Sequence, residues 1–176
     1  MKKFLMILAA AFVVVSASAQ VYVGGSFGVA STKVNGGDSH TTYRFLPEIG
    51  YNVDNNLAIG TVVGWGKGNP VNIERKEKGT FEVSPYVRYT FVHSNVINAF
   101  VEGGVGYKHY NDAGDMWNLG LKPGVSLNFK NFSFVTRVGF VGWRQFNPKE
   151  DHVDSSNAWG VSLDGNDVTF GLYYNF

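Results

Sequence analysis

The sequence predicts an all-β protein, an eight-stranded antiparallel up-and-down transmembrane β-barrel. Eight segments alternate apolar residues with small or polar ones, which is the period-two pattern of strands with two different faces. Very short turns and longer polar loops alternate between these segments, as they do in a membrane meander. After the N-terminal segment, no stretch is long and apolar enough for a transmembrane helix, so any membrane crossing must use strands.

The N-terminal segment has the layout of a secretory signal peptide. Two lysines precede an apolar run from Phe4 to Val15, and Ala17 and Ala19 supply the small residues of a cleavage site. The apolar run is too short to cross a bilayer as a helix, which needs roughly 20 residues. We therefore expect residues 1–19 to be removed and residues 20–176 to form the barrel.

The composition excludes several classes of site. The chain contains no cysteine, which rules out disulfides, thiolate metal sites and cysteine catalysis. The net charge of +1 gives no electrostatic basis for nucleic-acid binding. Charged residues make up 16% of the chain and aromatic residues 15%, a balance that favours a membrane surface over a soluble one.

Each predicted strand follows the same alternation. In the last one, Thr169 and Tyr173 fall on a polar or small face, opposite an apolar face that ends in Phe176. Its length of about nine residues is sufficient to cross a bilayer as part of a closed barrel. The predicted strands are Val21–Ala30, Thr42–Val53, Leu57–Gly66, Phe81–Phe91, Ile97–Lys108, Trp117–Phe129, Phe132–Trp143 and Val168–Phe176.

The connections between these strands come in two kinds. Tight turns are predicted at 54–56, 93–95 and 130–131, where Asn, Asp and Ser are concentrated. Longer polar loops are predicted at 31–41, 67–78, 109–116 and 144–166. With an even number of strands, both termini are expected on the side of the short turns, the periplasm.

Three prolines recur every 38 residues, at Pro47, Pro85 and Pro123, inside the second, fourth and sixth predicted strands. Because proline cannot donate a hydrogen bond to the sheet, we interpret each as a bulge or a skipped hydrogen bond. The alternative is that each strand begins after its proline.

The seventh predicted strand does not keep one alternation. Trp143 falls on the face of Arg137, whereas the preceding apolar residues fall on the other face. Either a bulge near Gly139 or Gly142 shifts the pattern, or Trp143 points into the lumen. The residues that share the apolar face are Phe132, Phe134, Val138 and Phe140.

The polar face is predicted to line the inside of the barrel. Eight strands leave an interior just wide enough for side chains to fill it, and charges placed there must pair. Glycine residues beside long charged side chains fit such a narrow interior, while aromatic and β-branched residues suit lipid. The alternative is a soluble, lipocalin-like barrel with its apolar face inward. The predicted network of lumen charges consists of Arg44, Glu48, Glu82, Arg88, Glu102, Lys108, Lys122 and Arg137.

The segments Leu46–Gly60 and Tyr173–Phe176, together with the signal peptide and the eight strands, resemble the small outer-membrane β-barrel domain family. The chain is similar in architecture to OmpX- and OmpA-type barrels, without the periplasmic domain of the OmpA type. The resemblance implies a monomer in the Gram-negative outer membrane, in contact with lipid and lipopolysaccharide. It also implies that the barrel-assembly machinery reads an aromatic signal in the last strand, at Phe170, Leu172, Tyr174 and Phe176.

The function expected from these features is structural or one of surface interaction, such as adhesion or envelope integrity, through the extracellular loops. The alternatives are a narrow pore and a lipid-modifying enzyme. No catalytic, cofactor or metal site is predicted. His109 lies near Asp115 without a nearby serine, Glu150–Asp154 does not match a calcium loop, and Gly103–Gly106 has no following helix to bind a nucleotide.

Overall fold

The computed structural model describes residues 20–33, 39–67, 79–111, 113–149, 154–163 and 168–176. The predicted signal peptide lies outside the described residues, as do the acidic segment 150–153 and the charged loop 68–78. A search of the described residues finds no helix that is both long enough and apolar enough to cross a membrane.

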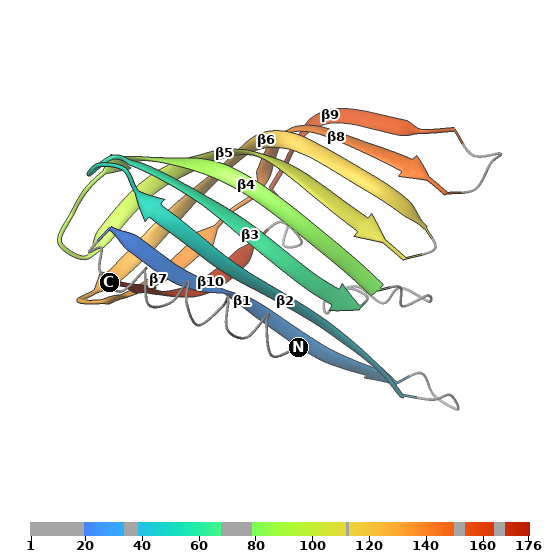
Figure 1. The fold of residues 1–176 in the computed structure, drawn as a ribbon, viewed down its shortest axis with the longest axis horizontal. Coiled ribbons are helices and arrows are strands. Elements are labelled where there is room, and N and C mark those ends of the chain that lie inside the picture. The colour runs from blue at the N-terminus through green and yellow to red at the C-terminus, as the bar shows by residue number, and fades with distance from the viewer. Residues whose placement is uncertain (1–19, 34–38, 68–78, 112, 150–153, 164–167) are drawn as a thin grey trace, which may run out of the picture.

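The described residues form one twisted antiparallel sheet that closes on itself (Figure 1). Consecutive strands pair as antiparallel neighbours from β1 to β7, and the alternation along each strand places the same face inward. The strands are β1 (Val21–Lys33), β2 (Ser39–Asn52), β3 (Leu57–Lys67), β4 (Gly79–Val92), β5 (Ile97–Tyr110), β6 (Gly114–Phe129), β7 (Phe132–Arg137), β8 (Phe140–Pro148), β9 (Ser156–Ser162) and β10 (Thr169–Asn175).

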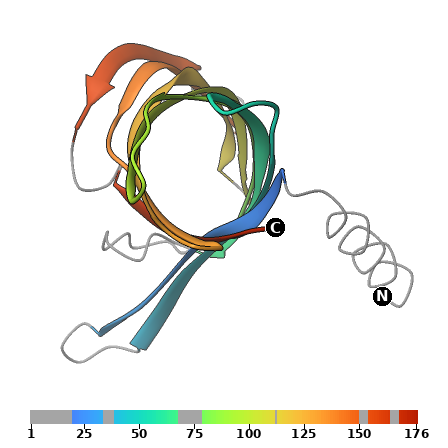
Figure 2. The same ribbon diagram turned by 90° about the vertical axis from the view of Figure 1, so that its left-hand side faces the viewer.

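Eight of these strands make the closed ring seen along the barrel axis in Figure 2. The ring runs from β1 to β7 in order and then to β10, which pairs with β7 on one side and β1 on the other. Residues Tyr22–Gly25 pair with Leu172–Asn175, so the two ends of the barrel domain lie side by side. The predicted eight-stranded antiparallel barrel is confirmed.

The two ends of the barrel differ in their connections. At one end, the turn end, Asp54, His93 and Lys130 lie in tight turns; the other end, the loop end, carries the longer connections. The Asp54 carboxylate accepts hydrogen bonds from the backbone N–H groups of Asn56 and Leu57, at 2.7 and 2.8 Å. These donors hold the pKa of Asp54 below its usual range and favour the compact turn.

The seventh predicted strand is interrupted at residues 138–139, where β7 ends and β8 begins. Gly139 has a φ of 76°, which lies in the left-handed region that favours glycine. The register against β6 shifts by one residue across this break, from Arg137 opposite Gly124 to Val141 opposite Leu121. The structure therefore agrees with the interpretation in which an irregularity near Gly139 shifts the inward and outward alternation of the strand.

The shift reverses the faces of the residues that follow it. Phe140, predicted on the apolar outer face, is 4% exposed and points into the barrel, so that part of the prediction is wrong. Trp143 lies directly opposite Leu119 and Trp159, which are both exposed on the outer face. Directly opposed residues share a face, so Trp143 also lies on the outside of the barrel.

The long loop predicted at 144–166 is also wrong in part. The strand β8 continues to Pro148, and Ser156–Ser162 forms β9 against it. Serine, asparagine and glycine in this segment indicated a loop, but pairing with β8 satisfies its backbone groups. Among the described residues, β9 pairs only with β8, and β1 beyond Gly25 pairs only with β2. These two hairpins extend outside the ring at the loop end (Figure 2).

The three prolines lie inside strands, so the alternative in which each strand begins after its proline is wrong. At Pro47 the pairing with β3 skips two residues without a change of register, and at Pro85 the pairing with β5 does the same. Pro123 lies where β6 changes partner from β7 to β8. Each proline therefore sits where one neighbouring strand needs no donor.

The outer face of the ring is apolar and exposed, and the inner face carries the charges. Large exposed residues occur on every strand of the ring, whereas the buried charged side chains Glu48, Glu102 and Arg137 all point inward. This arrangement is that of a membrane barrel and is the reverse of a soluble one. Exposed aromatic residues of the outer face are Phe27, Tyr43, Phe45, Tyr51, Trp65, Tyr89, Phe91, Trp117, Phe129, Phe132, Phe134, Phe170 and Tyr174.

Replacing Gly139 with alanine tests the break between β7 and β8. A Cβ atom there would lie 2.5 Å from the Ser162 carbonyl oxygen and from the Leu163 side chain, at a backbone angle that side chains disfavour. We expect Gly139→Ala to lower the free energy of unfolding by about 1–3 kcal/mol, measured by urea titration in lipid vesicles. The control is Gly160→Ala, whose Cβ meets nothing within 4 Å. Equal stability of the two variants would contradict a strained break.

Candidate functional site

Four charged side chains from four strands meet in the middle of the lumen. Glu48 comes from β2, Arg88 from β4, Glu102 from β5 and Arg137 from β7; together they are called the belt. Strand alternation turns all four inward, and the register of β4 and β5 places Arg88 directly opposite Glu102. Two carboxylates and two guanidinium groups make the belt neutral as a whole.

Short hydrogen-bonded ion pairs hold the belt together. Arg137 donates from Nε to Glu102 Oε2 at 2.6 Å and from Nη2 to Glu48 Oε1 at 2.8 Å. Arg88 donates from Nη2 to Glu102 Oε1 at 2.7 Å and lies 3.4 Å from Glu48 Oε1. Each guanidinium therefore bridges both carboxylates, which is the geometry that buried charges need to offset their desolvation.

Three tyrosines complete the belt, and the sequence analysis did not assign them to it. Tyr173 donates its hydroxyl to Glu48 Oε2 at 2.7 Å and accepts from Arg137 Nη1 at 2.8 Å. Tyr86 donates to Glu48 Oε1, and the hydroxyls of Tyr86 and Tyr22 are 2.6 Å apart. The feature of the sequence that could have assigned Tyr22, Tyr86 and Tyr173 to the lumen is their position on the polar face of their strands.

The aromatic residue Phe100 fills the remaining space beside the belt. Its ring is 1% exposed, and the guanidinium carbon of Arg88 lies 4.5 Å from the ring centroid. The same guanidinium carbon lies 5.2 Å from the centroid of the Tyr22 ring. Arg88 is thus enclosed by π-faces as well as by carboxylates. Alternation places Phe100 on the inner face. It was not predicted as a lumen residue because the prediction considered charged and polar side chains only.

The belt divides the lumen into two chambers. The turn-side chamber has a volume of about 440 Å³ and reaches from Arg88 and Tyr173 to the tight turns. The loop-side chamber has a volume of about 80 Å³ and lies above Glu48 and Arg137. Among the described residues, every fully buried side-chain nitrogen or oxygen has a hydrogen-bond partner. The middle of the barrel is therefore filled by a satisfied polar network.

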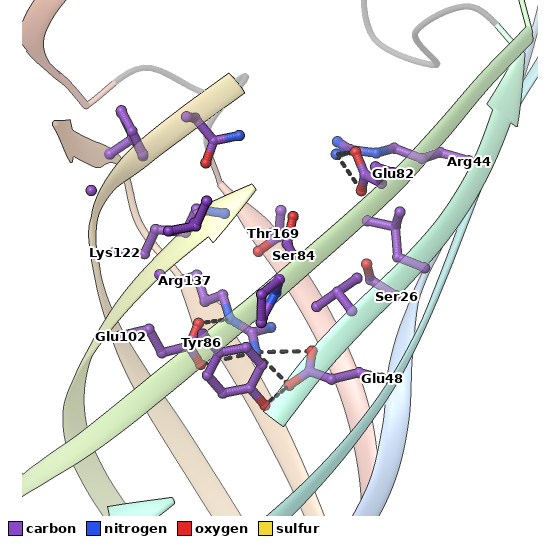
Figure 3. A pocket seen from close by; sticks show the side chains of 18 residues that line it. Ser26, Arg44, Glu48, Glu82, Ser84, Tyr86, Glu102, Lys122, Arg137 and Thr169 are labelled. Atoms are coloured by element: carbon purple, nitrogen blue, oxygen red, sulfur yellow. Dashed lines mark hydrogen bonds and ion pairs between the residues drawn. The ribbon is translucent and has the colours of Figure 1, made fainter. Parts of the chain in front are cut away.

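Of the remaining predicted lumen charges, Arg44, Glu82 and Lys122 line the loop-side chamber (Figure 3), and Lys108 lies beside Glu82. Arg44 donates from Nη2 to both carboxylate oxygens of Glu82 at 3.1 Å, and Lys108 Nζ lies 3.8 Å from Glu82 Oε2. Lys122 lies opposite Glu102 in the register of β5 and β6 and lines the chamber. The structure thus separates the eight predicted charges into the belt and a second group nearer the loops.

The pair formed by His109 and Asp115 sits on the outer face near the loop end. His109 Nδ1 lies 2.6 Å from Asp115 Oδ1, and the Tyr107 hydroxyl donates to the same oxygen at 2.9 Å. Both members of the pair are about two-fifths exposed. Among the described residues no group of three potential metal ligands occurs. Among the described residues, the printed side-chain contacts of this cluster join His109, Asp115 and Tyr107 and include no serine, which a hydrolase of the serine type would need beside its base.

An apolar outer wall, a filled polar lumen and hairpin connectivity define the chain as an outer-membrane-type β-barrel. The family model "Outer membrane protein beta-barrel domain" matches residues 4–176, and the chain belongs to this family.

A search of curated proteins finds no match. Among solved structures, the chain is similar to Neisserial surface protein A (NspA), with 13% identity over 90% of this chain and 98% of that one and a TM-score of 0.49. It is also similar to the N-terminal β-barrel domain of Pseudomonas aeruginosa OprF, with 12% identity, the same coverage and a TM-score of 0.49.

Replacing Arg137 with methionine tests the energetic role of the belt. The substitution keeps the bulk of the side chain but leaves Glu48 and Glu102 with one guanidinium between them. We expect Arg137→Met to lower the free energy of unfolding by about 3–5 kcal/mol, because it leaves a buried carboxylate without its counter-charge. The matched control is Arg44→Met, since the Arg44 side chain is 37% exposed and its ion pair contributes about 1 kcal/mol or less. Similar urea midpoints for the two variants would contradict a stabilising belt.

Proposed function

We propose that this outer-membrane β-barrel has a structural or surface-interaction role, in adhesion or envelope integrity, exerted through its extracellular loops. The observation that supports this proposal is the belt, which fills the middle of the lumen with paired and hydrogen-bonded side chains. A barrel with a filled interior interacts with its surroundings through its outer wall and its ends.

The proposed orientation places the turn end in the periplasm and the loop end outside. Outer-membrane barrels have short periplasmic turns and longer extracellular loops, and this chain has the same asymmetry. The start of β1 and the end of β10 then both lie on the periplasmic side. The hairpins β1–β2 and β8–β9, which extend outside the ring, then lie at the cell surface (Figure 1).

We also propose partners for the outer wall. The exposed apolar residues of the ring would contact lipid and lipopolysaccharide as a monomer. On β10, Phe170 and Leu172 are more than half exposed, while the rings of Tyr174 and Phe176 lie 4.9 Å apart. Phe170, Leu172 and Tyr174 share the outer face of β10, and Phe176 follows the strand with its ring against Tyr174. They are the proposed signal for the barrel-assembly machinery.

The two alternative functions receive less support from the geometry. A narrow pore requires a continuous passage, and the belt lies across it. A lipid-modifying enzyme requires a nucleophile beside a base, whereas the described contacts of His109 are with Asp115. We therefore propose a role without catalysis and without a resident cofactor.

The proposal is tested in a deletion strain that expresses either the wild-type chain or a variant with residues 69–77 replaced by glycine and serine. We expect the variant to insert normally, seen as heat-modifiable gel mobility, and to lose attachment to surfaces. Resistance to detergent should persist, since the barrel itself is unchanged. The Arg44→Met variant, with its loops intact, is the control for attachment.

The same strains distinguish the alternatives. An unchanged lipid A mass profile in the deletion strain is expected for a protein without lipid-modifying activity, and a changed profile would favour an enzyme. The proposed role is wrong if deletion alters neither attachment nor detergent resistance.

A further inference from the structure

The turn-side chamber is a space of ligand size at the turn end of the barrel, the end that faces the viewer in Figure 2. Its volume of about 440 Å³ falls in the range of roughly 300–1,000 Å³ that small-molecule sites occupy, whereas the loop-side chamber of about 80 Å³ does not. Arg88 and Tyr173 of the belt close the chamber on one side, and Asp54 and Lys130 lie in the tight turns at the other. The chamber therefore has a floor inside the lumen and a mouth at the turns.

Neutral hydrogen-bonding side chains encircle this chamber. The strands β2, β4, β5, β6, β7 and β10 each contribute such a side chain near the turns, and strand alternation directs all of them inward. Side-chain amides offer both donors and acceptors, and a hydroxyl can act as either. The residues of this set, called the amide ring, are Asn52, Thr90, Asn98, Asn128, Ser133 and Asn175.

Contacts within the protein leave much of the amide ring available to a ligand. The side chains of Asn52 and Thr90 are half-buried and form no hydrogen bond with a described residue. The Ser133 hydroxyl accepts from Asn175 Nδ2 and donates to Asn128 Oδ1, both at 2.8 Å. These two bonds fix the orientation of both amides. The nitrogen of Asn128 and the oxygen of Asn175 are thereby left for a ligand in the chamber.

The charges around the chamber do not favour an ionic ligand. Of the described residues, three with charged side chains line it, namely Arg88, Asp54 and Lys130. Arg88 is already paired with Glu102 and Glu48 inside the neutral belt. Asp54 and Lys130 have opposite signs and lie at the mouth. The ligand that fits this chamber is therefore neutral and is held by hydrogen bonds.

The pairing of the strands at this end disfavours a peptide ligand. A common mode of peptide binding adds a strand to an open sheet edge. Here β1 and β10 pair through Tyr22–Gly25 and Leu172–Asn175, so the described strands leave no open edge at the turn end. A sugar instead carries hydroxyl groups around the circumference of its ring. Those groups match donors and acceptors that six strands supply from all sides.

We propose that the turn-side chamber binds a neutral saccharide of one or two sugar rings through the amide ring. The site lies at the opposite end of the barrel from the loops. It goes beyond the proposed surface role, and neither proposal depends on the other.

The test uses residues 20–176 refolded in micelles of a polyoxyethylene detergent, which has no sugar headgroup. The side-chain amide resonances are followed by NMR during titration with glucose, N-acetylglucosamine and cellobiose. We expect at least one of these sugars to shift them saturably. Asn52→Ala should weaken that affinity about three- to tenfold, because a hydrogen bond to the ligand is lost. The matched control is Asn118→Ala, which removes an amide from the loop-side chamber instead.

Heat-modifiable mobility verifies that each variant is folded. Should Asn52→Ala not fold, Thr90→Val removes a hydroxyl from the same ring at nearly constant size, and a similar loss of affinity supports the same site. Raising the salt concentration should leave the affinity unchanged, since the ligand is neutral. A strong loss of affinity in salt would overturn the assignment to a neutral ligand.

A second arm replaces the sugars with a triglycine peptide blocked at both ends. Binding of this peptide but not of the sugars, weakened by Asn52→Ala, would overturn the assignment to a saccharide. Absence of saturable shifts with all three sugars would overturn the site itself. Wild-type affinity in both Asn52→Ala and Thr90→Val would do the same.

Discussion

The carboxylate of Glu48 is the contact on which the closed barrel depends. Its two oxygens accept hydrogen bonds from Arg137 and Tyr173, which lie 89 and 125 residues later in the chain. Tyr86, on β4, donates to the same carboxylate. One side chain therefore links β2, β4, β7 and β10 across the lumen. A buried carboxylate with several donors is strongly stabilised only when all of them are in place, so this contact favours complete closure over partly formed sheets.

The filled lumen also explains where interactions with other molecules can occur. A wide barrel uses its channel, but an eight-stranded barrel must fill its interior with side chains. Here every fully buried side-chain nitrogen or oxygen of the described residues is hydrogen-bonded, and buried apolar side chains such as Phe100, Val135 and Phe140 fill the space beside them. The strands then extend past the ring at the loop end, as the β8–β9 hairpin does. Strand edges at that end are open to other molecules, since β9 pairs only with β8 among the described residues.

Much of this architecture follows from period-two alternation alone. The outer position of Phe170 and Leu172 and the inner position of Glu48 and Arg88 are fixed once the strand boundaries are known, because strand side chains alternate strictly. The break at Gly139 limited this reasoning. A one-residue shift reverses every later face, and sequence offered two possible glycines without indicating which one takes a positive φ.

The belt was only partly visible in the sequence for a related reason. Charged residues on an inner face must pair, so Glu102 and Arg137 were identifiable as lumen residues. Which cation meets which carboxylate depends on the stagger of strands far apart in the chain, and alternation carries no information about stagger. Tyr22 and Tyr173 lie on the polar face of their strands, but the sequence does not show what their hydroxyl groups contact. Only the structure places the Tyr22 hydroxyl beside Tyr86 and the Tyr173 hydroxyl beside Glu48.

Single-channel recording on the purified barrel in planar bilayers tests most directly whether the belt closes the lumen. A closed lumen predicts no steady conductance for the wild-type protein. Reversal of charge in Arg88→Glu should produce conductance, because it places a third carboxylate against Glu48 and Glu102. Steady wild-type conductance that persists unchanged in Arg88→Glu would show an open passage and contradict closure by the belt.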